Sequence, residues 1–90
     1  MSRLNILVTG VVQGVGYRYS VARRAKECQI TGWVKNRSDG SVEIEAVGAR
    51  GMLEEFLRYV RVGPPASHIA GLQTQWFDDE PVYKDFNIRF

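Results

Sequence analysis

Apolar and polar side chains alternate in several short segments of this chain, with the period of two expected of strands that bury one face. The cleanest alternation follows an Asp-Gly pair typical of a hairpin turn. There Val42, Ile44 and Ala46 are separated by Glu43 and Glu45, which predicts one buried face and one wet face. In total we predict strands at Leu4–Val11, Ile30–Asn36, Val42–Ala46, Ile69–Phe77 and Phe86–Phe90.

Two other segments carry apolar residues at the three- and four-residue spacing of an amphipathic helix. Tyr17–Cys28 places small and branched side chains on one face, which lets a helix lie close to a sheet. Gly51–Val62 has a broader apolar face, and Gly63-Pro-Pro65 ends it because proline cannot continue a helix. A polar loop at Asp78–Pro81 precedes the last predicted strand.

The predicted order is strand, helix, strand, strand, helix, strand, with a short strand added at the end. This order is typical of the α+β ferredoxin-like sandwich, a βαββαβ fold in which two helices cover one face of an antiparallel sheet. We therefore expect one domain spanning residues 1–90, with a short extra C-terminal strand. A chain of this length buries roughly 60 to 65% of its unfolded surface.

The composition of the chain limits its expected partners and cellular compartment. The net charge is +2 with basic and acidic residues intermixed, so the sequence has no basic stripe suited to nucleic acid or to an anionic membrane. The single cysteine fits a reducing compartment, and the first residues lack the apolar core of a signal peptide. We expect a cytoplasmic monomer with no nucleic-acid or membrane partner.

The most informative stretch is Gly10-Val-Val-Gln-Gly-Val-Gly-Tyr-Arg18, a glycine-punctuated loop between the first predicted strand and the first predicted helix. Such a loop turns successive backbone amides toward one point, and the helix start adds unpaired N–H groups and the positive end of its dipole. Arg18 is spaced to lie on the inward face of the helix, and no Asp or Glu stands nearby in the sequence. A bound oxyanion such as phosphate is one candidate partner for it, and a distant carboxylate of the same chain is an equally good one.

Asn36 ends the second predicted strand. In a right-handed strand-helix-strand crossover the two strands run the same way, so Asn36 should face the loop at residues 10–18. Its side-chain amide can donate and accept, which suits a water held beside a bound anion. The competing interpretation is ordinary turn chemistry before Ser38-Asp-Gly40.

The remaining candidates for chemistry are weaker. His68 is the only histidine, and we expect it in a loop, while Cys28 should be a small buried hydrophobe on the first helix. Glu43 and Glu45 fit a wet strand face better than a catalytic carboxylate pair, and the acidic residues of the Asp78–Pro81 loop should be solvated. One histidine and one cysteine cannot form a zinc site, so we predict no metal and no cofactor.

These residues together resemble the acylphosphatase family. Its first signature is matched by Gly10, Val12, Gln13, Gly14, Val15, Tyr17 and Arg18, and its second by Gly32-Trp-Val-Lys-Asn36 with Gly40, Val42 and Gly48. Later landmarks are similar at Gly63-Pro-Pro65 and Phe86-Asn-Ile-Arg89, so the resemblance covers essentially the whole chain.

The resemblance implies metal-independent hydrolysis of acyl phosphates, which are carboxyl-phosphate mixed anhydrides, to a carboxylate and inorganic phosphate. It implies that Arg18 grips the phosphoryl group, or another oxyanion, and that Asn36 orients the attacking water. The backbone amides that would join Arg18 are those of Gln13, Gly14, Val15, Gly16 and Tyr17.

Two non-enzymatic interpretations compete with this one. A module that only binds acyl or carbamoyl phosphate would keep the same loop. An RNA-binding module of the same fold would need exposed aromatic side chains on its central strands, where this chain has Glu43 and Glu45. The presence of both Arg18 and Asn36 in a chain of 90 residues favours a free-standing hydrolase.

Overall fold

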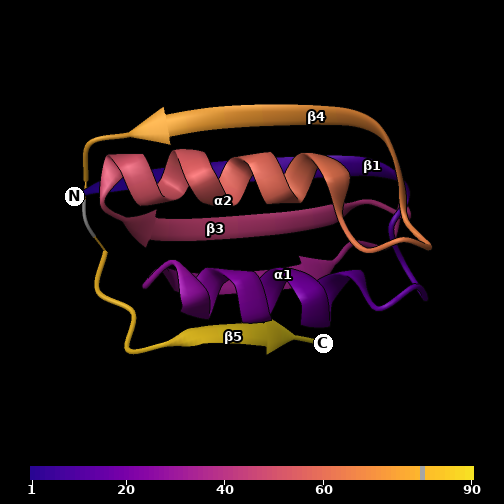
Figure 1. The fold of residues 1–90 in the computed structure, drawn as a ribbon, viewed down its shortest axis with the longest axis horizontal. Helices are drawn as coiled ribbons and strands as arrows, with labels where there is room; N and C mark the ends of the chain where they lie inside the picture. The colour runs from indigo at the N-terminus through magenta and orange to yellow at the C-terminus, as the bar shows by residue number, and fades with distance from the viewer. Residues whose placement is uncertain (80) are drawn as a thin grey trace.

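Figure 1 shows the computed structural model of the protein, which describes residues 1–79 and 81–90. At its centre is a sheet of five strands in the order β4-β1-β3-β2-β5. The strands are β1 (Ser2–Val11), β2 (Thr31–Asn36), β3 (Val42–Gly48), β4 (His68–Phe77) and β5 (Phe86–Arg89).

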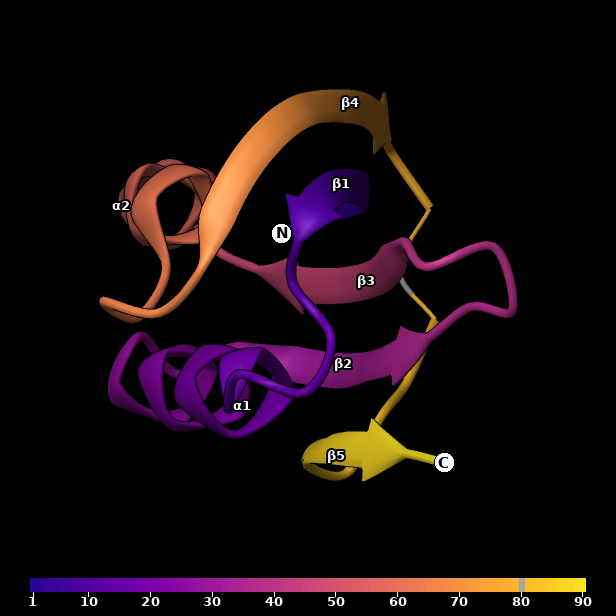
Figure 2. The same cartoon turned by 90° about the vertical axis from the view of Figure 1, so that its right-hand side faces the viewer.

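Two helices, α1 (Tyr17–Glu27) and α2 (Arg50–Val62), cover one face of this sheet, as Figure 2 shows. α1 packs against β2 and β5, whereas α2 packs against β3 and β4. Alternate residues of the strands, such as Leu4 and Ile6 of β1, form the buried core with the apolar faces of the helices. Phe56 of α2 meets Phe86 of β5 edge to face, with ring centres 6.1 Å apart. The predicted two-layer architecture is confirmed.

The short last strand makes the sheet mixed rather than purely antiparallel. β5 pairs in parallel with β2, with Gly32 opposite Phe86 and Lys35 opposite Arg89, while all other neighbouring strands are antiparallel. The sequence pattern predicts this strand but not its partner. Because the pairing is parallel, residues 89 and 90 lie near the end of β2 that carries Asn36.

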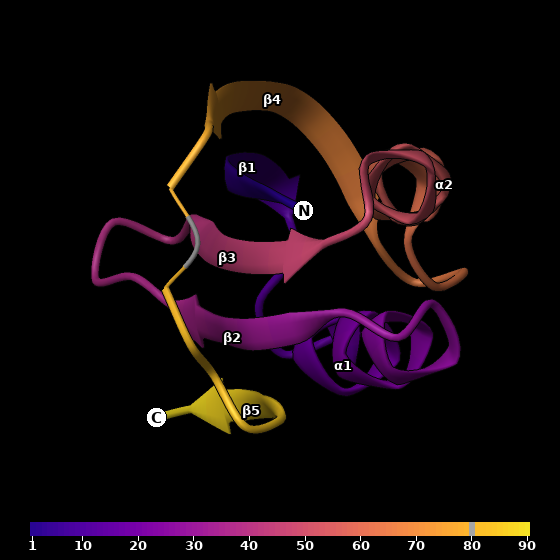
Figure 3. The same cartoon turned by 90° about the vertical axis from the view of Figure 1, so that its left-hand side faces the viewer.

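β1 and β2 run in the same direction because each is antiparallel to β3. Figure 3 shows these strands side by side, with both helices on one side of the sheet and the β2–β3 turn projecting on the other. The C-terminal ends of β1 and β2 therefore lie at one end of the sheet, beside the loop that leads into α1. This topology brings the glycine loop and Asn36 to the same end of the molecule.

His68 is the first residue of β4 and pairs with Val11, so the prediction of a loop position is wrong. The register of β1 with β4 shifts between Thr9 and Gly10. Gly10 has φ +122°, and a Cβ there would meet the carbonyl oxygen of His68 at 2.1 Å. Only glycine permits this close approach of the two backbones.

The face of the sheet away from the helices differs from the wet surface predicted for Glu43 and Glu45. Glu45 is buried and forms an ion pair with Arg3 at 3.1 Å, and the hydroxyl of Tyr83 donates to Glu45 at 3.4 Å. Residues 81–85, which lead into β5, lie on this side of the sheet (Figure 2). Alternation identified the face correctly but could not reveal what covers it.

The predicted polar loop at 78–81 is only partly described, since Glu80 lies outside the described residues. Asp79, expected to be free in solvent, is bonded to Arg3 at 2.9 Å, although its carboxylate is still largely exposed. In the described part of the chain, no helix has the length and apolar character needed to cross a bilayer.

Candidate active site

The loop between β1 and α1 depends on a left-handed backbone at two glycines. Gly14 has φ +74° and Gly16 has φ +77°, and a Cβ at either position would meet no atom within 4 Å. Space is therefore not the reason for glycine here. The requirement is the backbone conformation itself, which other residues adopt only at a cost.

The same loop leaves a run of backbone donors unpaired. Among the described residues, no acceptor is bonded to the amides of residues 13–19, and the first paired amide is that of Ser20, which donates to the carbonyl of Gly16 at 3.1 Å. The first turn of α1 contains no acidic residue that would offset the positive end of the helix dipole. These N–H groups and this dipole form an environment that favours an anion.

Arg18, the second residue of α1, is half-buried rather than enclosed on the inward helix face that the sequence spacing predicts. Its guanidinium extends to β5, where Nη1 donates to the carbonyl of Arg89 at 3.0 Å and Cζ lies 4.7 Å from the ring centre of Phe90. Within the described ranges, no carboxylate lies within ion-pair distance of Arg18. A guanidinium has five N–H donors, so most of them remain available to an anion.

Asn36 is the last residue of β2 and pairs with Val42 across the sheet. Its Oδ1 atom is buried and has no hydrogen-bond partner among the described residues. An unsatisfied buried oxygen costs about 1 to 3 kcal/mol, so such an atom needs an explanation. A donor that arrives from outside the chain, such as a water bound beside a substrate, would satisfy it.

Arg18 and Asn36 line one small pocket of about 160 Å³ at this end of the sheet. This volume holds a small oxyanion and a water, since a water occupies about 30 Å³ of liquid. The remaining lining residues come from the loop and the start of α1: Val12, Gly14, Gly16, Tyr17 and Tyr19.

The other residues of the predicted phosphate-binding loop differ in what they do. Tyr17 lines the pocket, yet its ring is buried, and its hydroxyl donates to the carbonyl of Val60 at 2.8 Å, tying α1 to α2. Burial raises the pKa of Tyr17 above its ordinary value, so the hydroxyl stays protonated. The side chain of Gln13 bonds to the carbonyls of Arg37 and Ser41 at 2.8 and 2.9 Å, away from the pocket. Gln13 thus fastens the loop to the β2–β3 turn.

Val15 packs against the core and lines a neighbouring depression instead of the pocket itself. Four other residues at this end of the sheet were not predicted from the sequence. Val12 and Tyr19 line the pocket, and residues 89 and 90 hold the guanidinium of Arg18. The signals for the last two residues were the short alternating segment at the end of the chain and the family landmark Phe86-Asn-Ile-Arg89, and neither identified the strand's partner.

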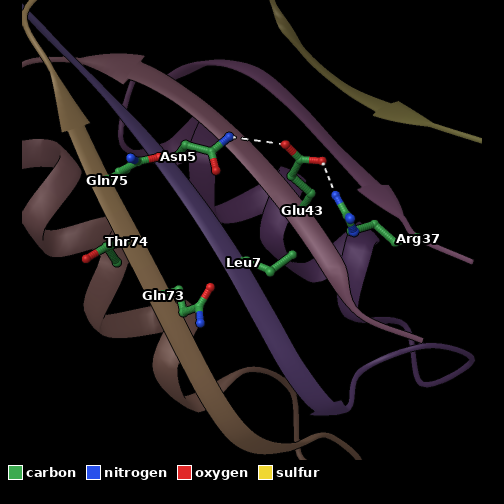
Figure 4. A pocket seen from close by; sticks show the side chains of 7 residues that line it. All are labelled: Asn5, Leu7, Arg37, Glu43, Gln73, Thr74 and Gln75. Carbon is green, nitrogen blue, oxygen red and sulfur yellow. Dashed lines mark hydrogen bonds and ion pairs between the residues drawn. The ribbon is translucent and has the colours of Figure 1, made fainter. Parts of the chain in front are cut away.

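A larger depression, of about 440 Å³, lies on the open face of the sheet and is shown in Figure 4. Three of its polar groups already pair with each other: Asn5 Nδ2 donates to Glu43 at 3.3 Å, and Arg37 Nη1 donates to the same carboxylate at 3.2 Å. The carboxylate of Glu43 would repel a phosphoryl group. This depression has the size of a ligand site, but the carboxylate among its lining residues disfavours an anion.

Neither of the two side chains weighed as nucleophile or base joins the pocket. Cys28 is buried at the end of α1, and burial raises the pKa of its thiol, which disfavours the reactive thiolate. His68 is exposed at the start of β4. Within residues 1–79 and 81–90, no three His, Cys, Asp or Glu side chains gather closely enough to hold a metal ion.

Comparison with known proteins gives consistent results over the full length. The family model described as Acylphosphatase matches residues 4–88. The acylphosphatase of Syntrophotalea carbinolica is 44% identical over 88 residues, which cover 98% of this chain and 96% of that protein. The crystal structure of acylphosphatase from Bacillus subtilis superposes with a TM-score of 0.98 at 38% identity and covers 100% of both chains. Full-length HypF, in its phosphate- and nucleotide-bound form, is also similar, with a TM-score of 0.87 and 32% identity over 100% of this chain but 12% of that one.

Proposed function

This chain belongs to the acylphosphatase family and hydrolyses acyl phosphates, and we propose that Arg18 and the amides of the 13–17 loop bind the phosphoryl group while Asn36 positions the attacking water. The substrate is a small molecule, a mixed anhydride of a carboxylic acid and phosphoric acid. Its products are the free carboxylate and inorganic phosphate.

The phosphoryl-binding part of the proposal is supported by the donors that have no partner in the chain. The guanidinium of Arg18 is held by the carbonyl of Arg89, and no described carboxylate neutralises it. Hydrogen bonds from a charged donor to phosphoryl oxygens are worth about 1.5 to 3 kcal/mol each. Charge on these oxygens shifts in a loose phosphoryl-transfer transition state, and preorganised donors there stabilise it without reorganising.

The water-positioning part rests on one observation, the buried and unpartnered Oδ1 of Asn36 on the pocket that Arg18 also lines. In the proposed step a water donates a hydrogen bond to this oxygen and directs its lone pair at phosphorus. The new P–O bond forms as the bond to the acyl oxygen breaks, and that electron pair leaves with the carboxylate. The water proton passes to the phosphate product or to solvent. A carboxylate is a stable leaving group, so this step uses neither a general acid nor a metal ion.

The test is steady-state hydrolysis of benzoyl phosphate by the parent protein and two variants, with and without a chelator. Arg18→Ala should lower kcat/KM about 100- to 1,000-fold, with both KM and kcat affected. Asn36→Ala should lower chiefly kcat. Chelator should change nothing.

The controls are exposed residues of the same types with no described partner, Arg61→Ala and Asn87→Ala, which should stay within twofold of the parent. Inorganic phosphate should inhibit the parent competitively and bind Arg18→Ala far more weakly. Parental turnover in either pocket variant would refute the role assigned to that residue, and inactivation by chelator would refute the metal-free step.

A further inference from the structure

We propose that the depression next to the phosphoryl pocket receives the acyl half of the substrate and favours aromatic acyl groups over acetyl. This inference rests on the proposed roles of Arg18 and Asn36. The depression has a volume of about 540 Å³ and lies between the start of α1 and the loop after α2. It is lined by Val15, Gly16, Tyr19, Ser20, Arg23 and Pro64.

Continuity with the phosphoryl pocket is the first argument. Gly16 and Tyr19 line both spaces, so they form the boundary that a substrate bound in both would cross. An acyl phosphate has its acyl group one oxygen atom from phosphorus. The acyl half must therefore lie in a space that adjoins the phosphoryl pocket.

In-line geometry then decides between the two neighbouring spaces. Attack on phosphorus places the water and the leaving acyl oxygen on opposite sides, so the acyl group should lie away from Asn36. A second adjoining depression shares Asn36 as a lining residue and also includes Lys35 and Phe90. The depression bounded by Tyr19 does not include Asn36. It is therefore on the leaving-group side.

The walls of this depression suit an aromatic ring. Tyr19 is 65% exposed, and within the described chain its ring and hydroxyl have no partner. Pro64 faces it from a loop that is fixed by Ser67, whose amide and hydroxyl both donate to the carbonyl of Pro64, at 2.9 and 2.6 Å. Val15 adds apolar surface at the base. The fixed position of Pro64 lowers the ordering cost of binding a planar apolar group, and the exposed ring of Tyr19 is free to stack on that group.

Arg23 gives the depression a charged outer rim. It lies four residues after Tyr19 on α1, is exposed, and forms no ion pair with any described carboxylate. A second anionic group at the far end of the acyl part would meet this guanidinium. The preferred substrates should thus be aromatic acyl phosphates, with a further gain from a distal carboxylate.

The experiment compares kcat/KM for acetyl phosphate, benzoyl phosphate and 4-carboxybenzoyl phosphate. Tyr19→Ala should lower the benzoyl-to-acetyl ratio about fivefold, as expected for losing one aromatic contact, and Tyr19→Phe should keep it. Arg23→Gln should leave that ratio unchanged and lower the 4-carboxybenzoyl-to-benzoyl ratio about two- to fivefold. Inhibition by inorganic phosphate should be unchanged in Arg23→Gln, because phosphate has no acyl part and Arg23 does not line the phosphoryl pocket.

Lys35→Gln, in the depression that shares Asn36, is the matched control and should move neither ratio. An unchanged benzoyl-to-acetyl ratio in Tyr19→Ala would overturn the inference, as would a change confined to Lys35→Gln. A failure of the proposed role of Arg18 would give a different result: inorganic phosphate would inhibit Arg18→Ala as strongly as the parent.

Discussion

Two clusters of polar side chains on this molecule each contain an arginine and an asparagine, but they differ in whether these side chains have partners within the chain. On the open face of the sheet, Arg37 and Asn5 both bond to Glu43, so the cluster is closed on itself. At the end of the sheet, Arg18 has no described carboxylate and Asn36 has an unpartnered buried oxygen. The larger depression, of about 440 Å³, belongs to the closed cluster, and the smaller one, of about 160 Å³, to the open cluster. Unsatisfied bonding capacity, not volume, distinguishes the site from ordinary surface.

The largest difference between the two clusters should appear when the same substitution is made in each. Arg18→Lys should lower kcat/KM for benzoyl phosphate about 100-fold, because an ammonium cannot reproduce the planar fork of donors. Arg37→Lys should leave kcat/KM within twofold, since its partner Glu43 is a half-buried carboxylate away from the phosphoryl pocket that an ammonium also satisfies. Steady-state kinetics on both proteins provides the measurement. Equal losses would mean that the two arginines are not functionally different.

The converse test changes a residue on the same open face of the sheet, away from the helices, and measures stability. Glu45→Ala removes the buried partner of Arg3 and should lower the free energy of unfolding by about 2 kcal/mol, or the melting temperature by about 10 °C. The loss is moderated because Arg3 keeps its contact with Asp79. The activity of the folded variant should match the parent at a temperature well below its melting point. Lost activity without lost stability would show that the open face contributes to the reaction.

Two glycines with left-handed backbones allow an effect on stability to be distinguished from an effect on activity. Gly16 and Gly40 have φ +77° and +92°, and a Cβ on either would meet no atom within 4 Å. Alanine at each should therefore cost a similar amount, about 1 to 2 kcal/mol of stability. Only Gly16→Ala should also lower kcat, about tenfold, because the amides that face the phosphoryl group would be displaced. Paired chemical denaturation and kinetics would show whether activity follows the loop or merely stability.

The smallest effect is expected at the turn that joins the two regions. Hydrogen bonds from the hydroxyl and amide of Ser41 hold the pKa of Asp39 below its ordinary value of 3.8. Its carboxylate therefore stabilises the fold above that pH, and the contribution is lost as the pH falls through the lower pKa of the folded state.

Asp39→Asn mimics the protonated form, so its urea midpoint should lie slightly below that of the parent at neutral pH and converge with it in acid. Activity should not change, since Gln13 still fastens the loop to this turn. A midpoint difference that persists in acid would contradict the assignment to Asp39.

Much of this arrangement could be predicted from the sequence because it depends on local pattern and on strand direction. Alternation gave the strands, and the direction of β1 and β2 put Asn36 beside the glycine loop. The burial of Glu45 escaped prediction because alternation identifies a face and not the segment that later covers it. The contact of Arg18 with β5 was not predicted for a related reason. Helical spacing placed it on the inward face, whereas its side chain reaches a strand 71 residues away.

That long-range contact has a consequence for when the enzyme becomes competent. The loop, Arg18 and Asn36 leave the ribosome early, but the carbonyl and ring that steady the guanidinium belong to residues 89 and 90. β5 must dock in parallel beside β2 before this support exists, and closing the long intervening segment has an entropic cost. With the role proposed for Arg18, full turnover requires the C-terminal strand to be docked beside β2, so regained activity reports this pairing and not only the compactness of the chain.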